Sequence, residues 1–264
     1  MPAPPEVDDL GSPVAIPQVP RRIVSIVPSL TEAVAVTAPD LLVAATRWCI
    51  HPHTLDVARV GGTKNPDVDA IVALRPDVVL ANEEENREPD LRAMRAAGLG
   101  VWVTRVRSLE EAFRSLRRVV TVACRREVPD WLVAAQLAWE SAPTVANRGL
   151  AVVPVWRRPW MVVGRDTFAG DVLRRLGVRN AFGDHVERYP KVPLPELLAV
   201  GPDLVVLPDE PYPFGPLDGP ESFPGVPCAL VSGRHLTWYG PSLAEAPGIL
   251  TAQLDAARGD GPGS

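Results

Sequence analysis

Side chains suited to binding a flat ligand gather in a few short segments of this 264-residue chain, each directly after an apolar run. Tryptophan, tyrosine and arginine stack on flat or bulky molecules, and carboxylates and amides hydrogen-bond to a polar edge. Four of the seven tryptophans and three of the four histidines lie in these segments. The candidate ligand-binding residues are Arg47, Trp48, Cys49, His51, Glu83, Glu84, Glu85, Asn86, Arg87, Trp156, Arg157, Trp160, Tyr212, Arg234, His235, Trp238 and Tyr239. The combination predicts a site for a bulky, partly flat ligand.

One of these segments also raises the question of a metal, because Cys49, His51 and His53 follow one another closely. A thiolate with imidazoles suits zinc or copper, and Glu83 to Glu85 would add oxygen ligands. Alternate residues of a loop seldom converge on one point, and a lone cysteine is more often a small buried hydrophobe. A histidine can instead be the axial ligand of a bound macrocycle, for which His51 and His235 are the candidates.

Motifs for catalysis are scarce. The chain contains no G-x-S-x-G elbow, no phosphate-binding P-loop and no H-E-x-x-H zinc motif. We therefore predict no catalytic residue and no required cofactor. An enzyme that uses Cys49 as nucleophile and His51 or His53 as base is the alternative. A chaperone that passes a metal or a corrinoid to another protein is a third possibility.

Apolar runs alternate with helix signals along the chain, which predicts an α/β fold with parallel sheets covered by helices. In the first half we expect strands at 22–27, 42–46, 77–81 and 101–104, and helices at 29–38, 65–74, 88–98 and 108–127. In the second half we expect strands at 150–155, 161–164, 204–207 and 228–231, and helices at 166–177, 196–200 and 242–257. Ser29 and Ser108 have capping-box spacing, and Asp166 is expected to cap the helix on which Asp171 faces solvent.

Two similar stretches of sequence indicate two lobes. Residues 71–80 (IVALRPDVVL) and 197–206 (LLAVGPDLVV) each read as a helix end, a Pro-Asp turn and an apolar strand, although Pro-Asp is also a common turn. We predict two Rossmann-like lobes joined by a single backbone helix. The expected parts are an extended segment at 1–20, an N-terminal lobe at 21–128, a connecting helix at 129–143, a C-terminal lobe at 144–258 and a tail at 259–264.

Composition narrows the classes of function. With 27 basic and 32 acidic residues the net charge is −5, which excludes a broad basic surface for nucleic acid. The 46% hydrophobic content supports a sizeable core, and three separated cysteines exclude a disulfide framework. No run approaches the ~20 apolar residues of a membrane span, so no membrane insertion is expected. Because the N-terminus lacks a basic and then apolar leader, we expect a cytoplasmic protein, or an extracytoplasmic one if a leader has been removed.

Several stretches together resemble a known family. They are 22–32 (RIVSIVPSLTE), 62–67 (GTKNPD) with 71–80, 163–168 (VGRDTF), 176–181 (LGVRNA), and 189–192 (YPKV) with 196–206. Over about residues 21–250 the chain resembles the class III substrate-binding proteins of ABC importers, the helical-backbone metal receptor superfamily. Within it the chain is most similar to the cobalamin-binding branch, as a cytosolic member without a signal peptide.

The resemblance implies a non-catalytic protein that clasps a corrinoid, haem or other metal chelate between two lobes with little hinge motion. It also implies docking to a permease through one acidic residue per lobe. The first docking position falls near Asp69, whereas the second falls on Pro195, with Glu196 beside it. This departure, together with the missing lipid-anchor cysteine, argues against the usual docking.

Overall fold

A computed structural model of the protein describes residues 6–142 and 147–259, which form two compact units. Of the described residues, unit 1 consists of those up to Val106 with Glu111–Val133 and Tyr239–Pro241, and unit 2 of Arg107–Glu110 with those between Ala134 and Trp238 and those from Ser242 onward. Helix α5 (Asp130–Glu140) contributes its first residues to unit 1 and the rest to unit 2. The end of the predicted connecting helix at 143 and nearly all of the predicted tail lie outside the described residues.

Unit 1 is built on a sheet of five parallel strands in the order β5-β4-β3-β6-β7. The strands are β3 (Ile23–Ser25), β4 (Leu42–Ala45), β5 (Ala58–Arg59), β6 (Val78–Asn82) and β7 (Val101–Thr104). The helices are α1 (Pro28–Thr37), α2 (Val68–Ala73), α3 (Glu88–Ala96) and α4 (Leu109–Arg118), which continues into a π-helical turn at Val119–Ala123. The chain order of the strands is therefore 3-2-1-4-5, which is the doubly wound order 3-2-1-4-5-6 without its sixth strand.

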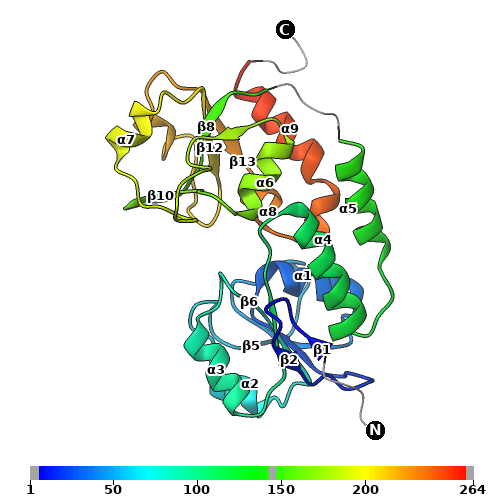
Figure 1. Ribbon diagram of the computed structural model, residues 1–264. Helices are drawn as coiled ribbons and strands as arrows, with labels where there is room; N and C mark the ends of the chain where they lie inside the picture. Colours follow the sequence, from blue (N-terminus) through cyan, green and yellow to red (C-terminus); the bar gives the residue numbers. More distant parts are fainter. Residues whose placement is uncertain (1–5, 143–146, 260–264) are drawn as a thin grey trace. The chain divides into compact units, whose positions relative to one another are not determined.

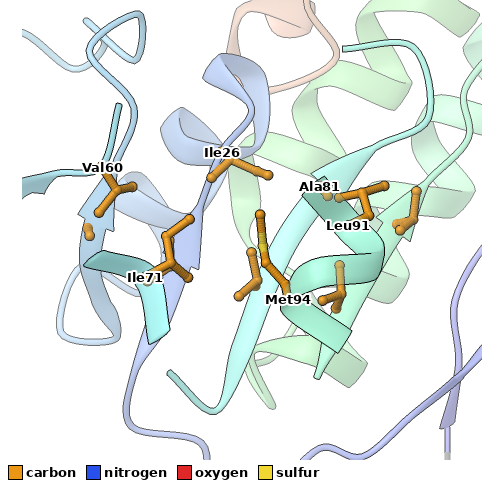
Figure 2. Packing of buried hydrophobic residues seen from close by; sticks show 11 residues of the cluster. Ile26, Val60, Ile71, Ala81, Leu91 and Met94 are labelled. Atoms are coloured by element: carbon orange, nitrogen blue, oxygen red, sulfur yellow. The ribbon is translucent and has the colours of Figure 1, made fainter. Parts of the chain in front are cut away.

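The side chains of the unit 1 strands point alternately to the two faces of the sheet, and this alternation determines which residues form the core. Val79 and Ala81 of β6 point to the face covered by α2 and α3, where they pack with Ile71 and Met94. Figure 2 shows Met94 between the strands and α3, with Ile71 reaching the sheet from α2. Val78 and Leu80, the alternate residues, are buried as well. Both faces are covered, which is why β6 reads as a continuous apolar run.

Unit 2 contains a second parallel sheet, in the order β11-β8-β12-β13. Its strands are β8 (Leu150–Val152), β11 (Arg179–Asn180), β12 (Leu204–Pro208) and β13 (Cys228–Val231), beside an antiparallel ribbon of β9 (Pro154–Arg157) and β10 (Trp160–Val162). The helices are α6 (Phe168–Arg175), α7 (Leu194–Ala199), α8 (Gly233–Thr237) and α9 (Ala246–Ala256), with 3-10 turns at Pro220–Ser222 and Pro241–Ala244. Figure 1 shows both sheets with their helices.

The N-terminal segment is not simply extended. Strands β1 (Glu6–Val7) and β2 (Pro13–Val14) pair as an antiparallel ribbon. Asp9 N donates to Val103 O at 3.2 Å, and the buried carboxylate of Asp8 accepts from Val103 N at 3.3 Å. The segment therefore hydrogen-bonds to β7, the edge strand that would otherwise present unpaired backbone groups.

The repeated Pro-Asp turn has the same structural role in both units. Asp77 accepts hydrogen bonds from the backbone N–H groups of Arg21 and Arg22 at 2.7 and 2.9 Å, just before β3. Asp203 accepts from Leu150 N at 2.7 Å, at the start of β8. Each aspartate thus ties the turn before one strand to the beginning of its neighbour.

Several predicted element boundaries are wrong. Helix α1 begins at Pro28 without a side-chain cap, because proline suits the first helical position, and Ser29 is buried in its first turn. Thr167, rather than Asp166, caps α6 by accepting from Gly170 N at 3.3 Å. Helix α9 begins at Ala246 rather than at residue 242, and a 3-10 turn at Pro241–Ala244 precedes it.

Two predicted loops are regular elements. Trp156, Arg157 and Trp160 lie on the β9–β10 ribbon, and Arg234 and His235 lie on α8. Asp171 does not simply face solvent either. Its side chain is only 12% exposed, pairs with Arg174 and Arg175, and accepts from Leu109 N at 2.9 Å at the start of α4. Among the described residues, no helix combines the length and apolarity that crossing a membrane requires.

The hydrogen bonds that Asp77 accepts lead to a prediction about stability. We expect Asp77→Ala to lower the free energy of unfolding by about 1–2 kcal/mol, because two backbone donors lose a charged acceptor. Asp184→Ala is the matched control, since that carboxylate is exposed, and should change stability by less than about 0.5 kcal/mol. Urea unfolding of both variants measures the difference. Equal stability of the two variants would show that the hydrogen bonds of Asp77 do not stabilise the fold.

Candidate functional site

The order of the strands indicates where each unit can receive a ligand. In open α/β sheets, ligands bind at the carboxyl ends of the strands where the strand order reverses. In unit 1 this point lies between β3 and β6, and in unit 2 between β8 and β12. The loop after β4 and the acidic loop after β6 lie at this edge of unit 1. The segment that begins with Asp209 and Glu210 follows β12 in unit 2.

The loop after β4 presents an exposed tryptophan on a fixed backbone. Trp48 is 63% exposed, with Arg47 exposed beside it. The guanidinium of Arg59 donates to Thr46 O at 3.0 Å and to Cys49 O at 2.9 Å, on either side of Trp48. Gly62 packs against the side chain of Asn65, since a Cβ there would lie 2.4 Å from Asn65 Oδ1 and 3.4 Å from Trp48 Nε1. Sequence reasoning missed Arg59, because nothing local marks an arginine that braces a preceding loop.

The acidic loop after β6 is shaped by two asparagines. Asn82 Oδ1 accepts from Glu84 N at 2.8 Å and Glu85 N at 3.2 Å. The buried Asn86 accepts from Asn82 N at 2.8 Å and donates to Thr63 O at 2.9 Å. Asn86 was predicted to bind ligand, but its amide is used inside the protein. The side chains of Glu83, Glu84 and Glu85 remain half-buried along the loop.

Cys49 is not placed as a reactive thiol. Its side chain is fully buried, and Thr31 Oγ1 and Thr46 Oγ1 lie 3.1 and 3.2 Å from its sulfur. Burial raises the pKa of the thiol above its usual value despite these hydrogen bonds, so it stays protonated at neutral pH. This environment argues against the predicted nucleophile, and it also removes Cys49 from the ligand-contact set.

The histidines near Cys49 do not complete a metal cluster with it. The rings of His51 and His53 lie 4.5 Å apart between centroids, half-buried and exposed respectively. In the described part of the chain, no three or more His, Cys, Asp or Glu side chains form a group that could hold a metal ion. His235 uses both ring nitrogens, on Ser232 Oγ at 2.8 Å and Glu245 Oε1 at 3.1 Å, which argues against it as a metal ligand.

The aromatic residues of unit 2 divide into exposed and packed members. Trp156 is 42% exposed and meets Tyr212 edge to face, with 5.5 Å between ring centroids. Tyr212 is oriented by its hydroxyl, which donates to Asp218 Oδ2 at 2.8 Å. Trp160 instead stacks on the buried Phe214, with 6.0 Å between centroids, and packs half-buried against the core of unit 2. Trp156 and Tyr212 are therefore the residues of this group that suit ligand contact.

Burial and ion pairing also remove other predicted contacts. Tyr239 is buried in unit 1, with its hydroxyl 3.3 Å from Thr104 Oγ1, and Trp238 is only 9% exposed. Arg157 forms ion pairs with Asp218 and Glu221. Arg87 pairs with Asp90 at 2.9 Å, and Arg234 with Glu245 at 3.4 Å. Of the predicted residues, Arg47, Trp48, Arg87 and Trp156 are exposed, Arg87 in spite of its ion pair. The half-buried ones are His51, Glu83, Glu84, Glu85, Arg157, Trp160, Tyr212 and Arg234.

The environment of Cys49 gives a labelling prediction. At pH 8 we expect Cys49 to react with a thiol reagent at least about tenfold more slowly in the folded protein than in guanidinium, because the raised pKa and burial both suppress the thiolate. Comparison with Cys49→Ala assigns the slow phase, and the half-buried Cys228 is the internal control. Rapid labelling of Cys49 in the folded protein would restore the nucleophile hypothesis.

Comparison with known proteins agrees with this architecture. A family model described as "Periplasmic binding protein" matches residues 23–211. The uncharacterized ABC transporter substrate-binding lipoprotein YvrC of Bacillus subtilis (strain 168) is 26% identical over 216 residues, covering 77% of this chain and 68% of the relative. A vitamin B12-binding protein of Pectobacterium carotovorum subsp. carotovorum (strain PC1) is 23% identical over 256 residues, covering 93% of this chain and 91% of the relative.

A solved structure supports the same fold. The periplasmic heme-binding protein from Pseudomonas aeruginosa superposes with a TM-score of 0.70 at 24% identity, covering 90% of this chain and 92% of that one. The predicted class, α/β with Rossmann-like parallel sheets, is thereby confirmed.

Proposed function

The chain belongs to the periplasmic binding protein family, and we propose that its ligand is a corrinoid. The protein is a ligand-binding protein similar to the substrate-binding proteins of ABC transporters. The observation that carries the corrinoid proposal is the exposed indole of Trp48, held by Arg59 at the ligand-binding edge of unit 1. Relatives that are named for binding vitamin B12 and heme support a flat macrocyclic ligand.

Unit 2 supplies a second aromatic surface of the same kind. Trp156 is exposed and rests on the edge of Tyr212, which Asp218 orients. A flat ring system gains dispersion and hydrophobic free energy on such faces, and little side-chain entropy is lost because the rings are already fixed.

The charge of the acidic loop favours a corrinoid over haem. Glu83, Glu84 and Glu85 place three carboxylates next to one another at the edge of unit 1. The side-chain amides of a corrinoid are neutral and can donate hydrogen bonds to carboxylates. Haem carries two propionates, which carboxylates repel. Haem is therefore the second candidate ligand.

We propose a receptor rather than an enzyme. The thiol that an enzyme would use, Cys49, is buried and protonated. A chaperone that delivers a corrinoid or metal shares the binding step with a receptor and differs only in its partner. Capture of that partner would distinguish the two.

If a permease receives this protein, we propose that Asp69 and Glu196 form the contacts. Both side chains are exposed, and each lies in the first turn of the helix that precedes a Pro-Asp corner, α2 and α7 respectively. Asp69 lies eight residues before Asp77, whereas Glu196 lies seven before Asp203, so Glu196 is adjacent to the equivalent position, which Pro195 occupies. The cytoplasmic location stays a prediction from the sequence.

Titration with cyanocobalamin, monitored by tryptophan fluorescence and corrin absorbance, tests the ligand. We expect saturable binding, and more than tenfold weaker binding for Trp48→Ala and for Trp156→Ala, a loss of about 1.4 kcal/mol or more each. Val36→Ala is the control, because Val36 is similarly exposed, at 50%, but lies in the last turn of α1 at the opposite edge of the sheet. Unchanged affinity in both tryptophan variants would remove this site.

The acidic loop makes a prediction about selectivity. Replacing Glu83, Glu84 and Glu85 together by glutamine should strengthen haemin binding relative to cyanocobalamin, because the repulsion of the propionates disappears while amide hydrogen bonding is kept. The ratio of the two dissociation constants, measured at low and high salt, reports the effect. A ratio unchanged from wild type would show that the loop does not contact the ligand.

A further inference from the structure

A carboxyl group at the edge of unit 2 has no part in the contacts described above. Glu210 follows β12 by two residues, at the point where the strand order of the unit 2 sheet reverses. This is the position where open α/β sheets bind ligands. An acidic residue directly after an apolar strand is a visible sequence signal, but nothing in the sequence shows that this one is largely buried.

The carboxyl group of Glu210 is closely packed, and only one of its two oxygens has a hydrogen-bond partner. Its Oε1 is buried without a hydrogen-bond partner, while the side chain of Trp238 hydrogen-bonds to the carboxyl group. A Cβ on Gly233 would lie 2.3 Å from Glu210 Cγ and 2.7 Å from its backbone oxygen. The start of α8 is therefore packed directly on this side chain, and only glycine permits the approach. A buried oxygen without a donor is costly if it carries charge.

The charged groups around Glu210 do not neutralise it. The neighbouring Asp209 adds negative charge, and its Oδ1 accepts from Gly233 N at 2.6 Å. Arg234 on α8 attracts the carboxylate but also pairs at 3.4 Å with Glu245, which precedes α9 and hydrogen-bonds to His235 as well. Burial first, and then Asp209, raise the pKa of Glu210 to about 7.

We propose that ligand binding on unit 2 is coupled to the uptake of one proton from solvent by the Glu210 carboxyl, with Trp238 following the change through their hydrogen bond. A ligand that covers this edge removes the water still available to the carboxyl group. Because the neutral acid loses less hydration free energy than the carboxylate, covering the site favours protonation. The coupling rests on the proposed function, since it needs a ligand at this edge.

The first test uses the ligand-free protein. Tryptophan fluorescence of wild type should show a transition near pH 7, and Trp238→Phe, which removes the proposed reporter, should abolish it. Glu210→Gln should abolish the transition, whereas Glu187→Gln, at an exposed glutamate of the same unit, should keep it. The same transition in Glu210→Gln overturns the proposal.

Thermal unfolding provides a readout independent of any ligand. The pKa of Glu210 in the folded state lies above the ordinary value of 4.5. Protonated Glu210 therefore contributes its full share to the free energy of unfolding below about pH 4.5, and this contribution is lost as the pH rises to about 7. The Tm of Glu210→Gln minus the Tm of wild type should therefore be larger at pH 8 than at pH 5. An equal Tm difference at both pH values also overturns the proposal.

The coupling itself is measured with cyanocobalamin. Wild-type affinity should rise on going from pH 8 to pH 6, by up to about tenfold for one proton. Glu210→Gln should bind equally at both, near the wild-type value at pH 6. Binding that is independent of pH in wild type, or equally dependent in both proteins, overturns the coupling. Absence of binding at either pH instead overturns the corrinoid proposal, so the two failures are distinguishable.

Discussion

Backbone hydrogen bonds between parallel strands determine where most of the candidate contacts of this protein can lie. In the five-stranded and the four-stranded sheet all strands run the same way, so their carboxyl ends meet at one edge and the returning helices start there. Asp77 and Asp203 secure the opposite ends by accepting backbone N–H groups at the start of β3 and β8. The same corner in both units explains why two stretches of sequence are alike: each must close a helix and begin a buried strand.

The second constraint is that buried polar groups need partners. Asn86, Arg157 and His235 resemble ligand contacts in the sequence, yet each satisfies a neighbour within its own unit. Their hydrogen bonds shape the loops that carry the outward-facing side chains. Arg59 shows the same principle, because its guanidinium donates to the carbonyls on both sides of Trp48 and so braces the backbone that carries the exposed indole. Recognition by a few exposed aromatic rings depends on this internal polar framework.

The two units offer different chemistry for one kind of ligand. Unit 1 combines an exposed indole with a row of carboxylates, whereas unit 2 combines an exposed indole with a tyrosine and a largely buried acid, Glu210. Aromatic faces supply affinity with little regard for the identity of a macrocycle. For the corrinoid ligand that we propose, the carboxylates would supply discrimination, because they accept hydrogen bonds from amides and repel anionic groups. In this proposal, affinity and specificity come from separate side chains.

The sequence by itself determined the alternation of strands and helices, the repeated Pro-Asp corner and the segments that hold the aromatic and acidic residues, because these follow from local periodicity and turn chemistry. It did not determine that Cys49 and Tyr239 are buried, that residues 154–162 fold back as a ribbon, or that Trp48 and Trp156 remain exposed. Only the tertiary structure decided these points. Exposure and hydrogen-bond partnership depend on groups far away in the chain, such as Arg59 for Trp48 and Gly233 for Glu210, and no local pattern records them.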